Sequence, residues 1–293
     1  MRKLTACFIW IFLLIPLLAG CVDAQPQIVA TTAPVWEFTS AICAGTDLQV
    51  GLLVTENVSC LHDYTLKVSQ MRMVEAADVI VVNGAGLEDF LDDVLSTKQH
   101  LIDSSVDCHL HEISGHGHDH DHAHAHAAEN DPHIWLSPEN AKIMAQNICA
   151  ELTALYPQYA DTFAENFAVL SGELDRLQAY GEETLRTLTC RELITFHDGF
   201  AYFAESFDLT ILHAIEEESG SEASAQELKQ LINLVNDHHL PAVFTEQNGS
   251  VSAADVICAE THVPAYSLDM GMAGSGYFEA MYENIHTIKE ALG

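Results

Sequence analysis

A run of histidines interrupts the middle of the chain. Eight of the 17 histidines lie in a tract that is rich in glycine, alanine and aspartate and has no apolar periodicity: His109, His111, His116, His118, His120, His122, His124 and His126. Such a tract buries too little surface to offset the entropy of ordering its backbone, so we expect a mobile loop over residues 109–126. Neutral imidazole is a good ligand for zinc, copper, nickel and iron. The tract therefore predicts a segment that collects such a cation; its internal position argues against an appended tag.

The next histidine along the chain, His133, stands in a different setting. Residues 131–138 read Asp-Pro-His-Ile-Trp-Leu-Ser-Pro. This pattern is typical of a rigid turn that leads into a helix with proline in its first turn. A flexible imidazole tract that runs into a fixed imidazole suggests that a cation is captured and then delivered to a built site.

Three further segments place candidate metal-binding side chains directly after a predicted strand or in the loop that follows one. His62 and His197 are each followed by an aspartate that could orient the imidazole, and Asp269 follows an apolar run. With His133 they offer three imidazoles and one carboxylate, a set that suits zinc at about 2.0–2.2 Å per ligand. Spacing alone does not select them, because a lone histidine after a strand is more often a loop or core residue.

Strand and helix patterns alternate through both halves of the chain. We predict strands at residues 27–32, 48–54, 79–82, 101–102, 193–196, 209–215, 242–245 and 265–268, and helices at 34–44, 67–77, 87–94, 137–155, 199–207, 224–238, 252–260 and 277–291. Residues 159–188 carry a single apolar face and predict one helix of about 45 Å.

The alternation predicts an α/β fold with two lobes, each with a mostly parallel sheet, joined by one long backbone helix. We expect an N-terminal metal-binding lobe at 21–156, a linking helix at 157–189 and a C-terminal metal-binding lobe at 190–293. Ligands of parallel sheets bind beyond the carboxyl ends of the strands, so a cleft between the lobes is the expected site.

The first 20 residues have the features of a secretory signal peptide. Two basic residues precede an apolar run that is short for a membrane span, and Leu18-Ala19-Gly20-Cys21 resembles the lipobox of bacterial lipoproteins. The resemblance implies lipidation of Cys21 and a membrane-anchored, extracytoplasmic protein. Removing residues 1–20 lowers Lys+Arg from 11 to 9 and leaves Asp+Glu at 43, so the formal charge moves from −32 to −34. This charge argues against nucleic acid as a partner and favours attraction of cations.

The six cysteines beyond Cys21 leave two alternatives open. An even number of cysteines in an exported protein permits disulfides, but six allow 15 pairings and the spacing selects none. Buried free thiols are the other interpretation. The six are Cys43, Cys60, Cys108, Cys149, Cys190 and Cys258.

The chain resembles the metal-binding class of ABC-transporter solute-binding lipoproteins over nearly all of its mature length. The similar stretches are His62-Asp63-Tyr64, residues 76–88, the Asp131–Pro138 motif, Phe196-His197-Asp198 and Leu268-Asp269. The resemblance implies a two-lobed α/β receptor with a rigid linking helix, in which His62, His133, His197 and Asp269 bind the metal. Water is the alternative to Asp269, because Gly271 departs from the family pattern.

Histidine at position 197 and the preceding His-rich loop resemble the zinc branch of that class, so Zn²⁺ is the expected ligand and Mn²⁺ the alternative. The implied partner is the ABC permease of a metal importer, and we expect a monomer and not an enzyme. A surface adhesin or extracellular zinc buffer is a second interpretation. A zinc hydrolase is a third, but the chain has no HExxH helix.

Overall fold

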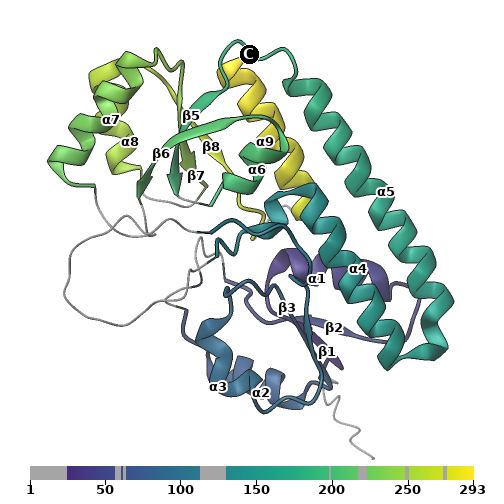
Figure 1. The fold of residues 1–293 in the computed structure, drawn as a ribbon. Coiled ribbons are helices and arrows are strands. Elements are labelled where there is room, and N and C mark those ends of the chain that lie inside the picture. Colours follow the sequence, from purple (N-terminus) through teal and green to yellow (C-terminus); the bar gives the residue numbers. More distant parts are fainter. Residues whose placement is uncertain are drawn as a thin grey trace, which may run out of the picture.

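The computed structural model describes residues 25–56, 61, 64–112, 130–197, 199–216, 223–247, 251–272 and 276–293, except for the side chains of residues 92, 93, 197, 215 and 216. Two lobes, each built of strands and helices, lie at the two ends of a long helix (Figure 1). The predicted two-lobed α/β class is confirmed.

The N-terminal lobe contains a parallel sheet of four strands in the order β2-β1-β3-β4. Ile28 of β1 lies opposite Val50 of β2 and Val79 of β3. All four residues of β3 are buried, as expected for an apolar run in a parallel sheet that is covered on both faces. The strands are β1 (Ile28–Ala30), β2 (Val50–Leu52), β3 (Val79–Val82) and β4 (Leu101–Asp103).

Alternate residues of these strands point to opposite faces of the sheet and pack into two separate apolar cores. Ile28 and Val79 point to the side of α1 (Ala33–Cys43) and α4 (Pro138–Leu155), where they join the main apolar core. Val29 and Ile80 point to the opposite side, with α2 (Val68–Ala76) and α3 (Asp92–Leu95). The predicted helix at 87–94 is divided into a 3-10 turn, η1 (Asp89–Leu91), and α3.

Helix α5 (Ala160–Leu185) follows a 3-10 turn, η3 (Pro157–Tyr159), and rises about 39 Å. It packs against α1 and α4 of the first lobe and against α9 (Tyr277–Leu292) of the second. Figure 1 shows it along one side of the whole molecule. Its buried stripe includes Phe163, Leu170, Leu174 and Leu177 of the predicted apolar face, and Phe167 of the same face is partly buried.

The C-terminal lobe continues the strand–helix alternation. Its parallel pairs are β5–β6 and β7–β8, and β5 lies beside β7. A further core between these strands and the two helices at residues 225–237 and 252–261 contains Ile194, Phe196, Leu231, Val235 and Ile257. The elements are β5 (Glu192–His197), α6 (Ala201–Ser206), β6 (Thr210–Glu216), α7 (Ala225–Asp237), β7 (Val243–Glu246), α8 (Ser252–Thr261) and β8 (Ala265–Leu268).

The described cysteines are free thiols: Cys43, Cys108, Cys149, Cys190 and Cys258. Burial raises the pKa of Cys43 and of Cys108 to about 12 in each case, so both thiols are unreactive near neutral pH. Cys60 and the predicted signal peptide with Cys21 lie outside the described residues. Of the helices in the described ranges, none combines the length and the apolar character that crossing a membrane requires.

Candidate metal site

His133 is held by an aspartate two residues before it. Asp131 Oδ1 accepts the backbone N–H of His133 at 2.9 Å and lies 2.7 Å from the imidazole Nδ1. Both residues are buried, at 3% exposure for His133 and 5% for Asp131. A buried carboxylate at this distance accepts a hydrogen bond from Nδ1–H, which fixes the tautomer and leaves the ring lone pair on Nε2, the nitrogen that could bind a metal. The ring is therefore held in the orientation that a metal ligand would need.

The turn that carries His133 is fixed from the N-terminal lobe. Asn83, directly after β3, donates from Nδ2 to the carbonyl of Pro132 at 2.9 Å. The backbone N–H groups of Asn83 and Gly84 donate to the Glu88 carboxylate, which also accepts a hydrogen bond from the Thr31 hydroxyl. Burial raises the pKa of Glu88 to about 7 despite these donors. Residues at the carboxyl ends of β1 and β3 thus set the position of the turn.

The same turn is also held from the C-terminal lobe. The Tyr202 hydroxyl, on α6, donates to the carbonyl of Asp131 at 2.7 Å and accepts the backbone N–H of His111 at 3.0 Å. Burial raises the pKa of Tyr202 to about 12, so it keeps its proton and remains a donor. The Trp135 indole Nε1 donates to the carbonyl of Met270, directly after Asp269, at 2.7 Å. The segments after β5 and β8 therefore meet at the turn of His133.

Asp269 lies just beyond β8 in a fixed backbone conformation. Its Oδ1 accepts the backbone N–H of Gly271 at 2.8 Å, and its backbone exchanges two hydrogen bonds with the Asn284 side chain of α9. Gly271 has φ +70°, a left-handed conformation that favours glycine. The residue that departs from the family pattern therefore lets the chain turn back and bond the carboxylate. Asp269 is half-buried, and the next residue, Met270, accepts the hydrogen bond from Trp135.

The predicted ligands are described to different extents. His133 and the backbone at Asp269 are brought near one another by the bond between Trp135 and Met270. His197 is the last residue of β5, and its backbone pairs with Glu216. His62, the side chain of His197, and the predicted orienting residues Asp63 and Asp198 lie outside the described residues. The complete four-ligand set stays a prediction.

The two first histidines of the predicted loop belong to the folded part of the chain. Glu112 forms an antiparallel bridge with Asn130, and the Asp131 N–H donates to the carbonyl of His111 at 2.8 Å. The expectation that the unstructured tract begins at His109 is therefore wrong for residues 109–112, because both sides of the tract pair as short antiparallel strands do. The later six histidines, residues 116–126, lie outside the described residues.

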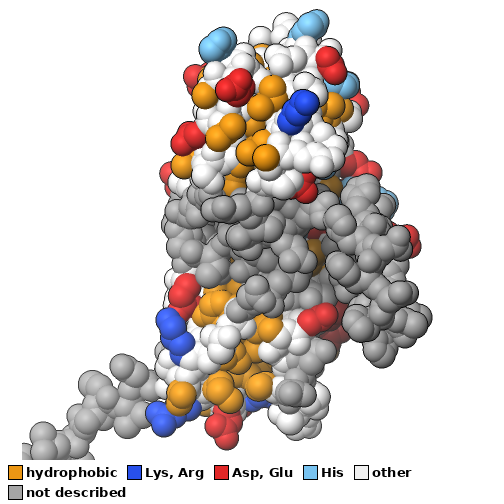
Figure 2. All heavy atoms as spheres, turned by 90° about the vertical axis from the view of Figure 1, so that its left-hand side faces the viewer, with side chains coloured by type: hydrophobic (Ala, Val, Ile, Leu, Met, Phe, Trp, Pro, Cys, Tyr) orange, Lys and Arg blue, Asp and Glu red, His pale blue; other side chains and the backbone are white. Residues whose placement is uncertain are grey.

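Sequence reasoning missed Asp131 as the orienting group of His133 and Glu205 as a neighbour of the loop histidines. An aspartate two residues before a candidate histidine is a readable signal for the first. No sequence signal marked Glu205 as a neighbour of the loop histidines, because it is one exposed glutamate on a short helix. On the face shown in Figure 2, acidic side chains are scattered over both lobes with few basic ones among them, which agrees with an attraction for cations.

Comparison with known proteins gives a consistent result. The family model described as zinc-uptake complex component A, periplasmic, matches residues 28–291. A zinc-binding lipoprotein, AdcA of Streptococcus pneumoniae serotype 4, is 29% identical over 292 residues, which cover 92% of this chain and 56% of the relative. The chain therefore spans about half the length of the curated relatives of this kind that it matches.

Two solved structures of ZnuA share the fold. A crystal structure of ZnuA has 31% identity and a TM-score of 0.81, covering 92% of this chain and 100% of the other. A ZnuA deletion mutant with zinc bound has 30% identity and a TM-score of 0.78, covering 92% of this chain and 98% of the other.

Proposed function

Because the chain belongs to the family of periplasmic zinc-uptake component A, we propose that it is an extracytoplasmic receptor that captures Zn²⁺ between its two lobes and delivers it to an ABC importer. The family is one of uptake components, which favours a binding protein over the hydrolase interpretation. The observation that carries the proposal is His133: a buried imidazole, oriented by Asp131, in a turn that Tyr202 and Met270 contact from the other lobe.

In this proposal His62, His133, His197 and Asp269 are the Zn²⁺ ligands. The orientation of His133, the position of His197 at the carboxyl end of β5 and the position of Asp269 after β8 support the set. Three neutral imidazoles and one carboxylate give Zn²⁺ a four-coordinate shell, whereas Mn²⁺ prefers more oxygen ligands. Residues 21–156 and 190–293 would be the lobes that close on the ion.

The location proposed for the receptor follows from its N-terminus. A lipid-modified Cys21 would tether it outside the cytoplasmic membrane, where it works as a monomer beside its permease. The signal-like residues 1–20 and a relative named as a zinc-binding lipoprotein support this arrangement. Mass spectrometry of the membrane fraction tests it: a diacylated or triacylated peptide beginning at Cys21 is the expected product, and a soluble chain cleaved elsewhere contradicts the anchor.

Metal competition tests the binding function. Zn²⁺ and Mn²⁺ are titrated into the metal-free mature chain in the presence of a chelator of known affinity. We expect Zn²⁺ to bind at least 100-fold more tightly than Mn²⁺, and His133→Ala to weaken Zn²⁺ binding by at least 100-fold. His286→Ala, on the exposed face of α9, is the matched control and should leave the affinity unchanged. Equal affinity for the two metals would exclude the zinc assignment.

Growth under zinc limitation tests the transport function. A strain that lacks this chain should fail to grow in chelator-treated medium, and added Zn²⁺ should restore growth. The wild-type gene should complement the strain and the His133→Ala gene should not. Normal growth of the deletion strain would favour an adhesin or a zinc buffer instead.

A further inference from the structure

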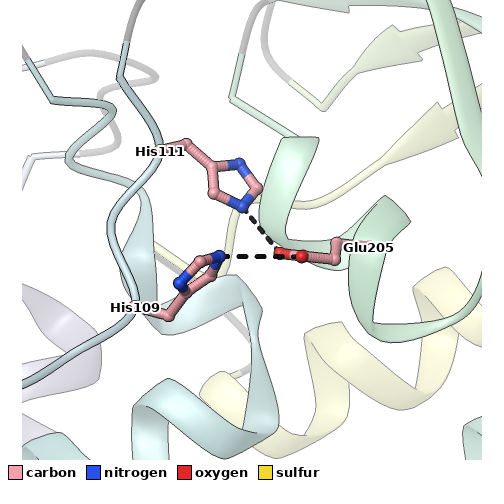
Figure 3. A group of neighbouring side chains, drawn as sticks. All are labelled: His109, His111 and Glu205. Carbon is pink, nitrogen blue, oxygen red and sulfur yellow. Dashed lines mark hydrogen bonds and ion pairs between the residues drawn. The ribbon is translucent and has the colours of Figure 1, made fainter.

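Two histidines and a glutamate meet at the base of the His-rich segment. His109 and His111 are the first two histidines of the His-rich tract, and Glu205 lies on α6 of the other half of the chain. The donor nitrogen or oxygen atoms of the three side chains all lie within 4.8 Å of one another. His111 Nε2 is 2.6 Å from Glu205 Oε2, and His109 Nε2 is 3.6 Å from Glu205 Oε1. Figure 3 shows both imidazoles directed at the one carboxylate.

The spacing of these atoms is close to that of a zinc shell. Donors bound at about 2.1 Å to a tetrahedral ion lie about 3.4 Å apart. The 3.6 Å between His109 Nε2 and Glu205 Oε1 is close to this value, and the 2.6 Å between His111 Nε2 and Glu205 Oε2 would widen by less than 1 Å. At present the short contact is a hydrogen bond that one proton occupies. For Zn²⁺ to bind at Nε2, the neutral His111 ring would carry its single proton on Nδ1 instead, and the ion would take the place of that proton between the nitrogen and the carboxylate.

The ring of His111 and the backbone of His109 are held by their surroundings. The His111 ring stacks on the Tyr202 ring with centroids 4.3 Å apart and planes 22° apart. The backbone of His109 exchanges two hydrogen bonds of 2.9 Å with the side chain of Asn140, which is 2% exposed. Little ordering of the His111 ring and of the His109 backbone is therefore needed when the ion binds.

An exposed histidine–glutamate pair is by itself an ordinary surface contact, and the chain contains one for comparison. His238 Nδ1 lies 2.9 Å from Glu192 Oε2, with both side chains partly exposed. There the carboxylate meets a single imidazole. At Glu205 two imidazoles meet the two oxygens of one carboxylate, and the group borders a solvent-open hollow of about 690 Å³ that water and hydrated ions can enter.

We propose that His109, His111 and Glu205 form a second Zn²⁺ site, distinct from the site of His133, with water completing the coordination shell. The choice of Zn²⁺ as the ion rests on the proposed function. The choice of the three ligands does not, because it follows from their geometry. The side-chain exposures of 68% for His109 and 56% for Glu205 make this site weaker than the buried one. Zn²⁺ bound here would join α6 to residues 109–112, the segment where the His-rich tract begins. The same segment pairs with Asp131, the residue that orients His133.

The test uses the mature chain with the six histidines at residues 116–126 changed to glutamine, which removes competing loop ligands. Zn²⁺ per chain is measured by elemental analysis after equilibrium dialysis at buffered micromolar free Zn²⁺. We expect two ions per chain. Glu205→Gln or His111→Asn in this background should lower the number to one, whereas the matched control Glu192→Gln should leave it at two. Circular dichroism verifies that each variant is folded.

The outcomes separate this proposal from the proposed function. Two ions that persist in the Glu205→Gln variant, or a single ion in the starting background that His133→Ala removes, would overturn the second site. A single ion that Glu205→Gln removes and His133→Ala leaves would support the second site and contradict the receptor site. Titration with Co²⁺ gives a further check, because tetrahedral Co²⁺ absorbs visible light. Loss in Glu205→Gln of the absorption due to the second equivalent of Co²⁺, with that of the first equivalent kept, would confirm the ligand assignment.

Discussion

The indole nitrogen of Trp135 donates a hydrogen bond of 2.7 Å to the carbonyl oxygen of Met270, which lies 135 residues away in the chain. Trp135 stands two residues after His133, and Met270 directly follows Asp269. The bond joins the N-terminal turn to the segment after the last strand of the C-terminal lobe. It is buried, with Trp135 at 1% and Met270 at 2% exposure. A hydrogen bond from a side chain that binds no metal therefore helps to set the relative position of two proposed ligands.

Replacing Trp135 by phenylalanine removes the donor while keeping an aromatic ring. The buried carbonyl of Met270 loses its partner, so the free energy of unfolding should fall by about 1–3 kcal/mol. Zinc release into excess chelator should become faster, because the lobes are held together less firmly. Trp36→Phe is the control: its indole bonds Val50 at 3.2 Å at an exposed position, where water can replace it. Equal effects of the two substitutions in urea unfolding and stopped-flow release would contradict this account.

Changing Asp131 to asparagine keeps the shape of the side chain but removes its charge. The His133 imidazole then becomes a weaker ligand and its tautomer is less strictly fixed, so zinc affinity should fall by about 10- to 100-fold. Chelator competition measures the change. Asp175→Asn, at an exposed ion pair with Lys142, should have no effect. An unchanged affinity in Asp131→Asn would mean that the carboxylate does not orient the ring.

Glu88 makes stability depend on pH. Its pKa in the folded protein is about 7, raised by burial from about 4.5. A raised carboxyl pKa stabilises the fold fully below the unfolded pKa, and this contribution is lost as pH rises through 7. The stability of the wild type relative to Glu88→Gln should therefore fall between pH 5 and pH 8, by at most on the order of 3 kcal/mol. Denaturant unfolding at several pH values measures it, and Glu183→Gln serves as the exposed control. A difference that is constant with pH would contradict the prediction.

Two glycines of α5 should respond oppositely to alanine. A Cβ at Gly172 would meet only the flexible end of Arg176 at 3.7 Å, so Gly172→Ala should raise the free energy of unfolding by about 0.5–1 kcal/mol. A Cβ at Gly181 would lie 2.2 Å from the Phe207 ring, so Gly181→Ala should lower it by about 1–3 kcal/mol. Thermal and denaturant unfolding of the two variants give a direct comparison. A stabilised Gly181→Ala protein would mean that Phe207 can move aside.

The fold could be predicted from the sequence because its strands are short apolar runs between clear helix patterns. The predicted strand at 79–82 has the bounds of β3, since Asp78 and Asn83 flank a run that is buried on both faces. The helix predicted at 87–94 was less accurate. Glu88 turns inward to accept hydrogen bonds from Thr31, Asn83 and Gly84, and the chain takes a 3-10 turn there before α3 begins.

The site could be predicted only in part. His133 carries a local signal, because its neighbours form a recognisable turn and helix start. The groups that fix the turn of His133 carry no such local signal. Tyr202 and Met270 contact this turn only because the two lobes pack together. Glu205 was unpredictable for the same reason: its approach to His111 depends on the stacking of His111 against Tyr202, two aromatic rings separated by 91 positions in the chain.

The bridge between Glu112 and Asn130 brings the two ends of the His-rich segment side by side. A loop that departs and returns at one point can change length at little cost, about 0.6 kcal/mol for each doubling. Lineages can therefore gain or lose histidines here, and an engineer can insert a fluorescent reporter, while the turn that presents His133 stays where its neighbours hold it.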